Sequence, residues 1–208
     1  MGTLIWQLND TWPVCSWSSL DYGGAWKLMH YMAKRFYQDV MVTAVPSGNT
    51  IELRAANDTP SKVPLVITAQ AVELDGSLRD LQQLSTMVGG RSTHIMTLSR
   101  GQLHEDELLA VTWSGDAGNG REIFAPKPYK SYDLNDPSVS MAANGNTVTL
   151  SADGLSLFTT VEADCPGRFS DNAFDMLPGE VRQVTFTPTD PAATPTFTLR
   201  DLYSATMT

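Results

Sequence analysis

The chain has 208 residues, which is enough for one large domain or two small ones. Its 42% hydrophobic and 18% charged residues are typical of a folded globular protein and exclude a disordered chain. The net charge of −9 would repel phosphate backbones, and no stretch reaches the roughly 18 to 20 apolar residues of a membrane span. We therefore expect no nucleic-acid or membrane partner. The localisation stays unknown, because no targeting segment is visible at the N-terminus.

The first 38 residues predict a strand, a loop and a helix. Residues 3–8 are mostly apolar, which favours a strand buried on both faces, as in a parallel sheet. Residues 9–24 carry turn-forming side chains and predict a long loop. Residues 25–38 repeat apolar side chains every three or four positions and predict an amphipathic helix. One such unit cannot bury a parallel strand alone, so we expect it to be a remnant of a larger barrel.

Residues 39–115 predict a small antiparallel sandwich of immunoglobulin type. Short apolar stretches alternate with turn residues, as such sandwiches require. The predicted strands cover residues 40–45, 50–55, 64–72, 94–98 and 108–113. Trp113 continues the last of these strands, so we expect it in the core. The apolar stripe of the helix at 25–38 should fold back on this first sandwich, or else be buried in a dimer.

Residues 116–137 are rich in glycine and proline and predict an extended linker. Residues 138–208 return to a β pattern and predict a second sandwich, with strands at 147–150, 155–163, 181–186 and 196–199. The predicted fold class is therefore mostly β. It consists of two immunoglobulin-like β-sandwiches preceded by a remnant strand–loop–helix unit of a (β/α)8 barrel.

Candidate catalytic groups are scarce in this sequence. Residues 1–51 contain no glutamate, and their only acids are Asp10, Asp21 and Asp39. A glycosidase needs two carboxylates at the scissile bond, and we find no credible pair. The two cysteines and three histidines are dispersed, so we predict no metal site, no cofactor and no catalytic residue in this chain.

Aromatic residues are the distinctive feature of the N-terminal segment. Four of the five tryptophans lie within the first 26 residues: Trp6, Trp12, Trp17 and Trp26. A flat apolar ring with a polar edge suits stacking against a sugar face.

Three stretches of the sequence carry a resemblance to a known family. The run Trp6-Gln7-Leu8-Asn9-Asp10-Thr11-Trp12-Pro13, with residues 16–22, Trp26-Lys27 and residues 30–37, resembles the eighth βα unit of the β-mannosidases of glycoside hydrolase family 2. Residues 124–130 resemble the linker between the two C-terminal sandwiches of those enzymes. Residues 167–174 and 177–180 resemble a signature of their last domain.

The resemblance implies that the parent protein is a retaining, exo-acting β-mannosidase that hydrolyses terminal β-mannosides with two glutamates on earlier barrel strands. This chain would be its C-terminal accessory region, inactive alone. Its partners would be the missing barrel of the same polypeptide and a β-mannoside or manno-oligosaccharide substrate. Substrate would contact Trp6, Asn9, Asp10 and Trp12, whereas Trp17 and Trp26 would pack structurally.

Two alternatives stay open at this point. The chain could be a free-standing carbohydrate-binding or adhesion protein built from tandem sandwiches, which the tryptophan cluster and the acidic charge favour. The parent could also be a family 2 hydrolase that acts on another β-glycoside, such as a glucosaminide.

Overall fold

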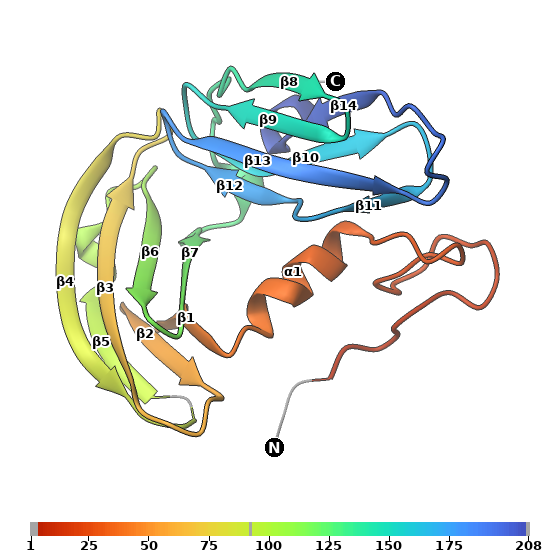
Figure 1. The fold of residues 1–208 in the computed structure, drawn as a ribbon. Coiled ribbons are helices and arrows are strands. Elements are labelled where there is room, and N and C mark those ends of the chain that lie inside the picture. The colour runs from red at the N-terminus through yellow and green to blue at the C-terminus, as the bar shows by residue number, and fades with distance from the viewer. Residues whose placement is uncertain (1–3, 92, 207–208) are drawn as a thin grey trace. The chain divides into compact units, whose positions relative to one another are not determined.

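The computed structural model describes residues 4–91 and 93–206 (Figure 1). The chain divides into two compact units. Gln38–Asn135 forms one, and the residues before it combine with the residues from Asp136 onward to form the other. Antiparallel sheets dominate both units, so the prediction of a mostly β chain with two sandwiches is confirmed. No helix within the described ranges has the length and apolarity needed to cross a membrane.

The middle unit is the first sandwich. One sheet has the order β1-β2-β5, from Val40–Ser47, Thr50–Asn57 and Thr93–Ser99. The other has the order β4-β3-β6-β7, from Leu78–Val88, Val63–Val72, Leu108–Gly115 and Gly118–Phe124. Two short 3-10 helices, η1 at Arg100–Gln102 and η2 at Tyr129–Ser131, lie in the connections.

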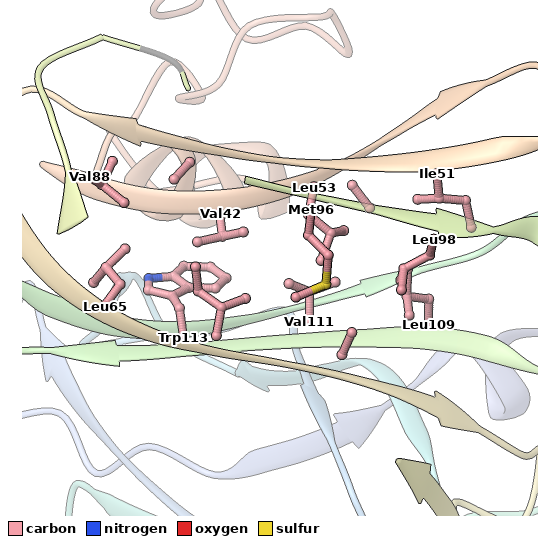
Figure 2. Close-up of a cluster of buried hydrophobic side chains, with 14 of the residues drawn as sticks. Val42, Ile51, Leu53, Leu65, Val88, Met96, Leu98, Leu109, Val111 and Trp113 are labelled. Atoms are coloured by element: carbon pink, nitrogen blue, oxygen red, sulfur yellow. The ribbon is translucent and has the colours of Figure 1, made fainter. Parts of the chain in front are cut away.

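The core of this sandwich follows from strand periodicity. Side chains alternate across a strand, so β1 buries Val40, Val42 and Ala44 while the residues between them are only partly buried. Facing side chains of the second sheet close the core, as Figure 2 shows for Leu65, Leu109, Val111 and Trp113, among others. Trp113 is 5% exposed, which confirms its predicted core position.

The second sandwich is built from residues after Asp136. One sheet has the order β11-β13-β9-β8, from Gly167–Phe169, Val181–Pro188, Thr147–Ser151 and Ser140–Asn144. The other has the order β12-β10-β14, from Phe174–Met176, Ser156–Ala163 and Phe197–Arg200, and a short helix α2 follows at Leu202–Thr206. Three phenylalanine rings, Phe169, Phe186 and Phe197, meet in the core with centroids 4.8 to 5.9 Å apart.

The strand predicted at residues 3–8 and the linker predicted at 116–137 differ from the structure. Residues 4–8 of the strand expected at 3–8 form no strand, because within the described residues this stretch receives only isolated backbone bonds, from Ser19 and Leu20, and no continuous strand pairs with it. Residue 3 lies outside the described residues. Residues 118–124, expected to begin the linker, form β7 and pair with β6. Gly120 is one of the glycines that favoured a linker in the sequence, but it lies within β7. A Cβ there would lie 2.3 Å from Cζ2 of Trp113, so this glycine serves close packing and not a turn.

Helix α1, Leu28–Phe36, is shorter than the predicted 25–38 and packs on the second sandwich. Tyr31 is 2% exposed and belongs to the core cluster of that sandwich, together with Val148, Val161 and Phe174. The expectation that this helix folds back on the first sandwich is therefore wrong. The buried face of α1 carries Tyr31 and Ala33, whereas Leu28, Met29 and Phe36 of the predicted apolar stripe are exposed. The ring and the hydroxyl of Tyr31 both find partners in the second sandwich.

The contact between Gly120 and Trp113 yields a stability prediction. Gly120→Ala would force the indole ring out of its position, and overpacking of this kind costs about 1–3 kcal/mol. We expect hydrogen exchange of the β3 and β6 backbone amides to accelerate accordingly. Gly89→Ala is the matched control, since a Cβ at Gly89 meets nothing within 4 Å. Equal protection in the two variants would contradict the packing role of Gly120.

Candidate functional site

The four residues predicted to contact sugar lie in the irregular segment before α1, and they differ sharply in exposure. Trp6 is 76% exposed and Trp12 is 66% exposed. Asn9 is also exposed, whereas Asp10 is 2% exposed. The structure thus presents two indole rings and one amide at the surface, and it turns the carboxylate of Asp10 inward.

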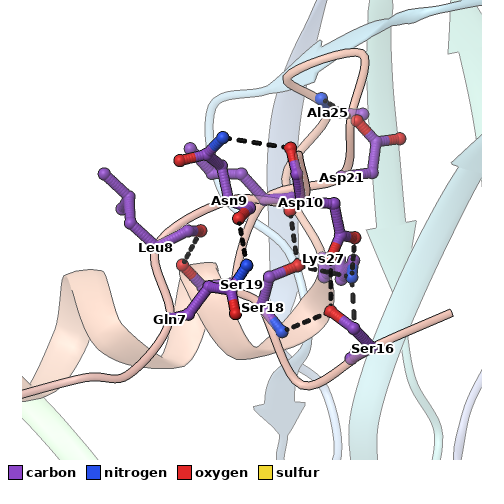
Figure 3. A network of polar contacts seen from close by, with 11 residues as sticks. Gln7, Leu8, Asn9, Asp10, Ser16, Ser18, Ser19, Asp21, Ala25 and Lys27 are labelled. Atoms are coloured by element: carbon purple, nitrogen blue, oxygen red, sulfur yellow. Dashed lines mark hydrogen bonds and ion pairs between the residues drawn. The ribbon is translucent and has the colours of Figure 1, made fainter. Parts of the chain in front are cut away.

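Backbone hydrogen bonds hold this segment in shape. The amide of Leu20 donates to the carbonyl of Leu8 at 2.9 Å, and the amide of Asp10 donates to the carbonyl of Leu20 at 3.2 Å. The amide of Ser19 donates to the carbonyl of Gln7, also at 3.2 Å. Residues 7–10 therefore lie alongside residues 18–20, joined by a parallel bridge between Asn9 and Leu20 (Figure 3).

Asp10 and Lys27 form the polar centre of the segment. The Nζ of Lys27 lies 2.8 Å from Oδ2 of Asp10 and also donates to the hydroxyl of Ser18 at 2.8 Å (Figure 3). The hydroxyl of Ser16 donates to Oδ1 of the same carboxylate. Both oxygens of Asp10 are therefore engaged within the chain. These hydrogen bonds, from Lys27 first and then from Ser16, hold the pKa of Asp10 below its usual value.

Sequence reasoning missed Lys27, although the sequence carries a signal for it. Lys27 stands at the N-cap of α1, where the helix dipole disfavours a cation. A lysine in that position needs an anionic partner. Two acids precede Lys27 in the sequence, Asp10 and Asp21, and Asp10 is the one that pairs with it. The three serines of the loop, Ser16, Ser18 and Ser19, were interpreted only as turn formers.

Trp26 is packed within the described residues, whereas Trp17 is exposed. The Trp26 ring lies 4.2 Å from the ring of His30 and 5.1 Å from that of Tyr31, centroid to centroid, and the Arg168 guanidinium lies over it at 5.3 Å. Trp26 therefore packs between α1 and the second sandwich. Trp17, expected to pack as well, is 70% exposed. The hydroxyl of Ser19 contacts Nδ1 of His30 at 3.0 Å, and burial lowers the pKa of that histidine.

Acidic residues also line a hollow of about 500 Å³ in the middle unit, among them Glu73, Asp75 and Glu107. Glu107 is 2% exposed, and its Oε2 lies 2.6 Å from a guanidinium nitrogen of Arg79. Burial raises the pKa of Glu107, but Arg79 and the backbone amide of His104 outweigh it and lower the pKa overall. A carboxyl held ionised in this way is unsuited to donate a proton. Over residues 4–91 and 93–206, no group of three His, Cys, Asp or Glu side chains could hold a metal ion.

Comparisons with known proteins connect this geometry to glycosidases. Residues 134–205 match the family Ig_mannosidase, described as an Ig-fold domain. Beta-mannosidase A of Aspergillus oryzae is 26% identical over 216 residues, covering 90% of this chain and 23% of that protein. The beta-mannosidase of Capra hircus is 27% identical, covering 93% of this chain and 24% of that protein. The chain thus spans about a quarter of the length of these relatives.

A solved structure shares the same arrangement of elements. The exo-chitosanase CsxA of Amycolatopsis orientalis superposes with a TM-score of 0.71 and 18% identity, over 94% of this chain and 29% of that one. At that identity the likeness establishes the fold alone. The region described here is therefore homologous to part of the β-mannosidases and shares its fold with part of an exo-chitosanase.

The ion pair of Asp10 yields a prediction on pH. Because its folded-state pKa is lowered, the ion pair contributes stability above about pH 4, and that contribution is lost as the pH falls through the folded-state pKa. We expect the carboxyl titration, followed by NMR, to have its midpoint below the usual value. Lys27→Met should raise this midpoint.

Asp164 is the internal control for this titration. Its pKa is lowered by the side chain and backbone of Thr196, not by Lys27, so its midpoint should not move in Lys27→Met. An Asp10 midpoint that stays in place when Lys27 is replaced would refute the assigned pairing.

Proposed function

We propose that this chain is the C-terminal accessory region of a retaining, exo-acting β-mannosidase of glycoside hydrolase family 2. The observation that carries the proposal is the alignment of 90% of this chain with 23% of Beta-mannosidase A of Aspergillus oryzae. The catalytic carboxylates belong to another part of the polypeptide, and residues 1–38 are the last βα unit of its barrel.

The exposure of the N-terminal segment supports this proposal. Large apolar side chains stand in solvent there, namely Leu4 at 79%, Trp6 at 76%, Leu8 at 59%, Trp12 at 66% and Trp17 at 70%. A folded domain rarely leaves so many together unless they meet a partner. The rest of a barrel would supply the neighbouring strands that residues 4–8 lack. It would also cover the exposed part of α1, which otherwise is available for a dimer.

In the proposed enzyme, Trp6 contributes an aromatic wall of the sugar site, and Asn9 and Trp12 contribute from the loop beside it. Side chains at the C-terminal ends of barrel strands line the substrate site in this fold class. Asp10 takes part through its pairing with Lys27, which fixes the backbone that carries Asn9. The sugar would then stack on Trp6 only in the site that the whole barrel closes.

The first expected outcome concerns the 208-residue chain by itself. It should not hydrolyse an aryl β-mannoside, because the two carboxylates of the mechanism lie elsewhere. Calorimetric titration with mannose and manno-oligosaccharides should detect no binding at millimolar concentrations. Measurable hydrolysis would overturn the proposal that the chain lacks the catalytic acids.

The second expected outcome concerns Trp6 in the longer polypeptide. Trp6→Ala should lower kcat/KM for an aryl β-mannoside by about tenfold or more, which corresponds to roughly 1.4 kcal/mol of lost transition-state binding. Trp17→Ala is the matched control, since Trp17 is similarly exposed here, at 70% against 76% for Trp6, but lies outside the proposed site. An equal effect of both substitutions would remove Trp6 from the sugar site.

A second candidate function is a free-standing carbohydrate-binding or adhesion protein. The solvent exposure of Trp6, Trp12 and Trp17 favours it, because such rings could stack on a sugar without further domains. Millimolar or tighter binding of manno-oligosaccharides by this chain would support it. A third candidate is an enzyme acting on another β-glycoside, and hydrolysis of an aryl β-glucosaminide in preference to the β-mannoside by the longer polypeptide would favour that.

A further inference from the structure

We propose that Arg35 is a positioning residue for the candidate sugar site, and that residues 169–173 of the second sandwich anchor it. The inference rests on the proposed function only in that residues 6–10 carry the sugar contacts. All of the contacts involved lie within one compact unit. They join residues that are about 137 positions apart in the chain.

The first step is the contact of Arg35 with the second sandwich. Its guanidinium donates to Oδ1 of Asp171 at 2.7 Å and to the carbonyl of Asn172 at 2.9 Å, and it also donates to the carbonyl of Ala173. A planar guanidinium with several donors suits an array of fixed acceptors of this kind. The neighbouring Lys34 donates to the carbonyl of Ser170 at 2.8 Å.

The second step is the rigidity of residues 169–173, which contact Arg35. The side chain of Asn172 pairs with the backbone of Val161 in β10. Its Nδ2 donates to the carbonyl of Val161 at 2.8 Å, and its Oδ1 accepts from the amide of Val161 at 2.9 Å. Asn172 is 4% exposed, so these bonds are shielded from water. Residues 169–173 are therefore fixed to the sheet, and the carbonyls that receive Arg35 are fixed with them.

The third step runs along α1 to the candidate site. Tyr31 lies in the core of the sandwich, and its hydroxyl accepts from the amide of Phe169 at 3.2 Å. At the start of the helix, the amide of Lys27 donates to the carbonyl of Ser19 at 3.0 Å, while its side chain holds Asp10. Residues 18–20 then bond to residues 7–10. Hydrogen bonds at Tyr31 and at Lys27, joined by the helix between them, thus connect the sandwich to the backbone beside Trp6.

The alternative interpretation is that Arg35 merely stabilises the helix locally. A nine-residue helix is not stable on its own, so tertiary contacts must hold it. Local stabilisation would leave residues 7–10 unaffected once Tyr31 is buried. The positioning role requires instead that the loss of Arg35 is felt at Asp10, Ser19 and Leu20, which are in no direct contact with it.

Hydrogen exchange of the 208-residue chain measures this difference directly. In Arg35→Ala, we expect the amides of Asp10, Ser19 and Leu20 to exchange about tenfold faster or more, while amides of β9 and β13 keep their protection. Arg35→Lys retains the charge but not the planar fork, and should give an intermediate acceleration. Arg54→Ala, which removes an exposed arginine paired with Glu52 in the other unit, should change none of these amides.

A milder variant covers the case in which Arg35→Ala disrupts the sandwich. Asp171→Asn removes the ion pair but keeps an oxygen that can accept from the amide of Asn172. We expect a smaller acceleration at Asp10, Ser19 and Leu20 with β9 and β13 intact. Protection of those three amides within twofold of the unmodified chain, in a variant whose sandwich is intact, would overturn the positioning role.

Kinetics of the longer polypeptide separate this inference from the proposed function. A fall in kcat/KM of Arg35→Ala, with unchanged hydrolytic pH profile and partial rescue in Arg35→Lys, would support both. Accelerated exchange at Asp10, Ser19 and Leu20 with unchanged kcat/KM would support the anchoring and overturn the placement of the sugar site. Unchanged exchange at these amides in Arg35→Ala, together with a lower kcat/KM in Trp6→Ala, would support the sugar site and overturn the positioning role of Arg35.

Discussion

The docking of α1 on the second sandwich is the contact on which the N-terminal segment depends. Residues 4–27 contain no helix or strand, and their own hydrogen bonds join only short loop stretches. The helix that follows has nine residues, too few to persist without tertiary packing. Burial of Tyr31 and the guanidinium bonds of Arg35 supply that packing. Trp26 adds to these contacts through Arg168, and together they fix the Asp10–Lys27 pair relative to the sheet.

Much of the fold was predictable because strand periodicity is a local property. In β1 and β2, apolar and less buried side chains alternate, and both strands were placed within two residues of their observed bounds. β4 was not predicted, because most of its residues are exposed at a sheet edge and its sequence therefore shows no apolar alternation. The strand expected at residues 3–8 shows the opposite error. An apolar run predicts burial, but a strand also needs a neighbour, and the sequence does not say where one is.

The candidate site was predictable in composition but not in arrangement. Trp6, Asn9 and Trp12 were identified from a motif, and the structure shows all three exposed. The inward orientation of Asp10 depends on Lys27, 17 residues later, and local patterns do not report such pairings. Contacts between α1 and residues 169–173 are more remote still. Their charges are visible in the sequence, but which arginine meets which carbonyl is decided by the tertiary fold.

The division of the chain has a consequence for its synthesis. The N-terminal segment and the second sandwich form one unit, and the whole first sandwich is inserted between them. Tyr31 stands 138 positions before its partner Phe169. At about 5–20 residues per second, a ribosome needs roughly 7 to 28 s to cover that separation. During this interval the middle unit can fold from contiguous sequence, whereas the tryptophan-rich segment waits for its anchor.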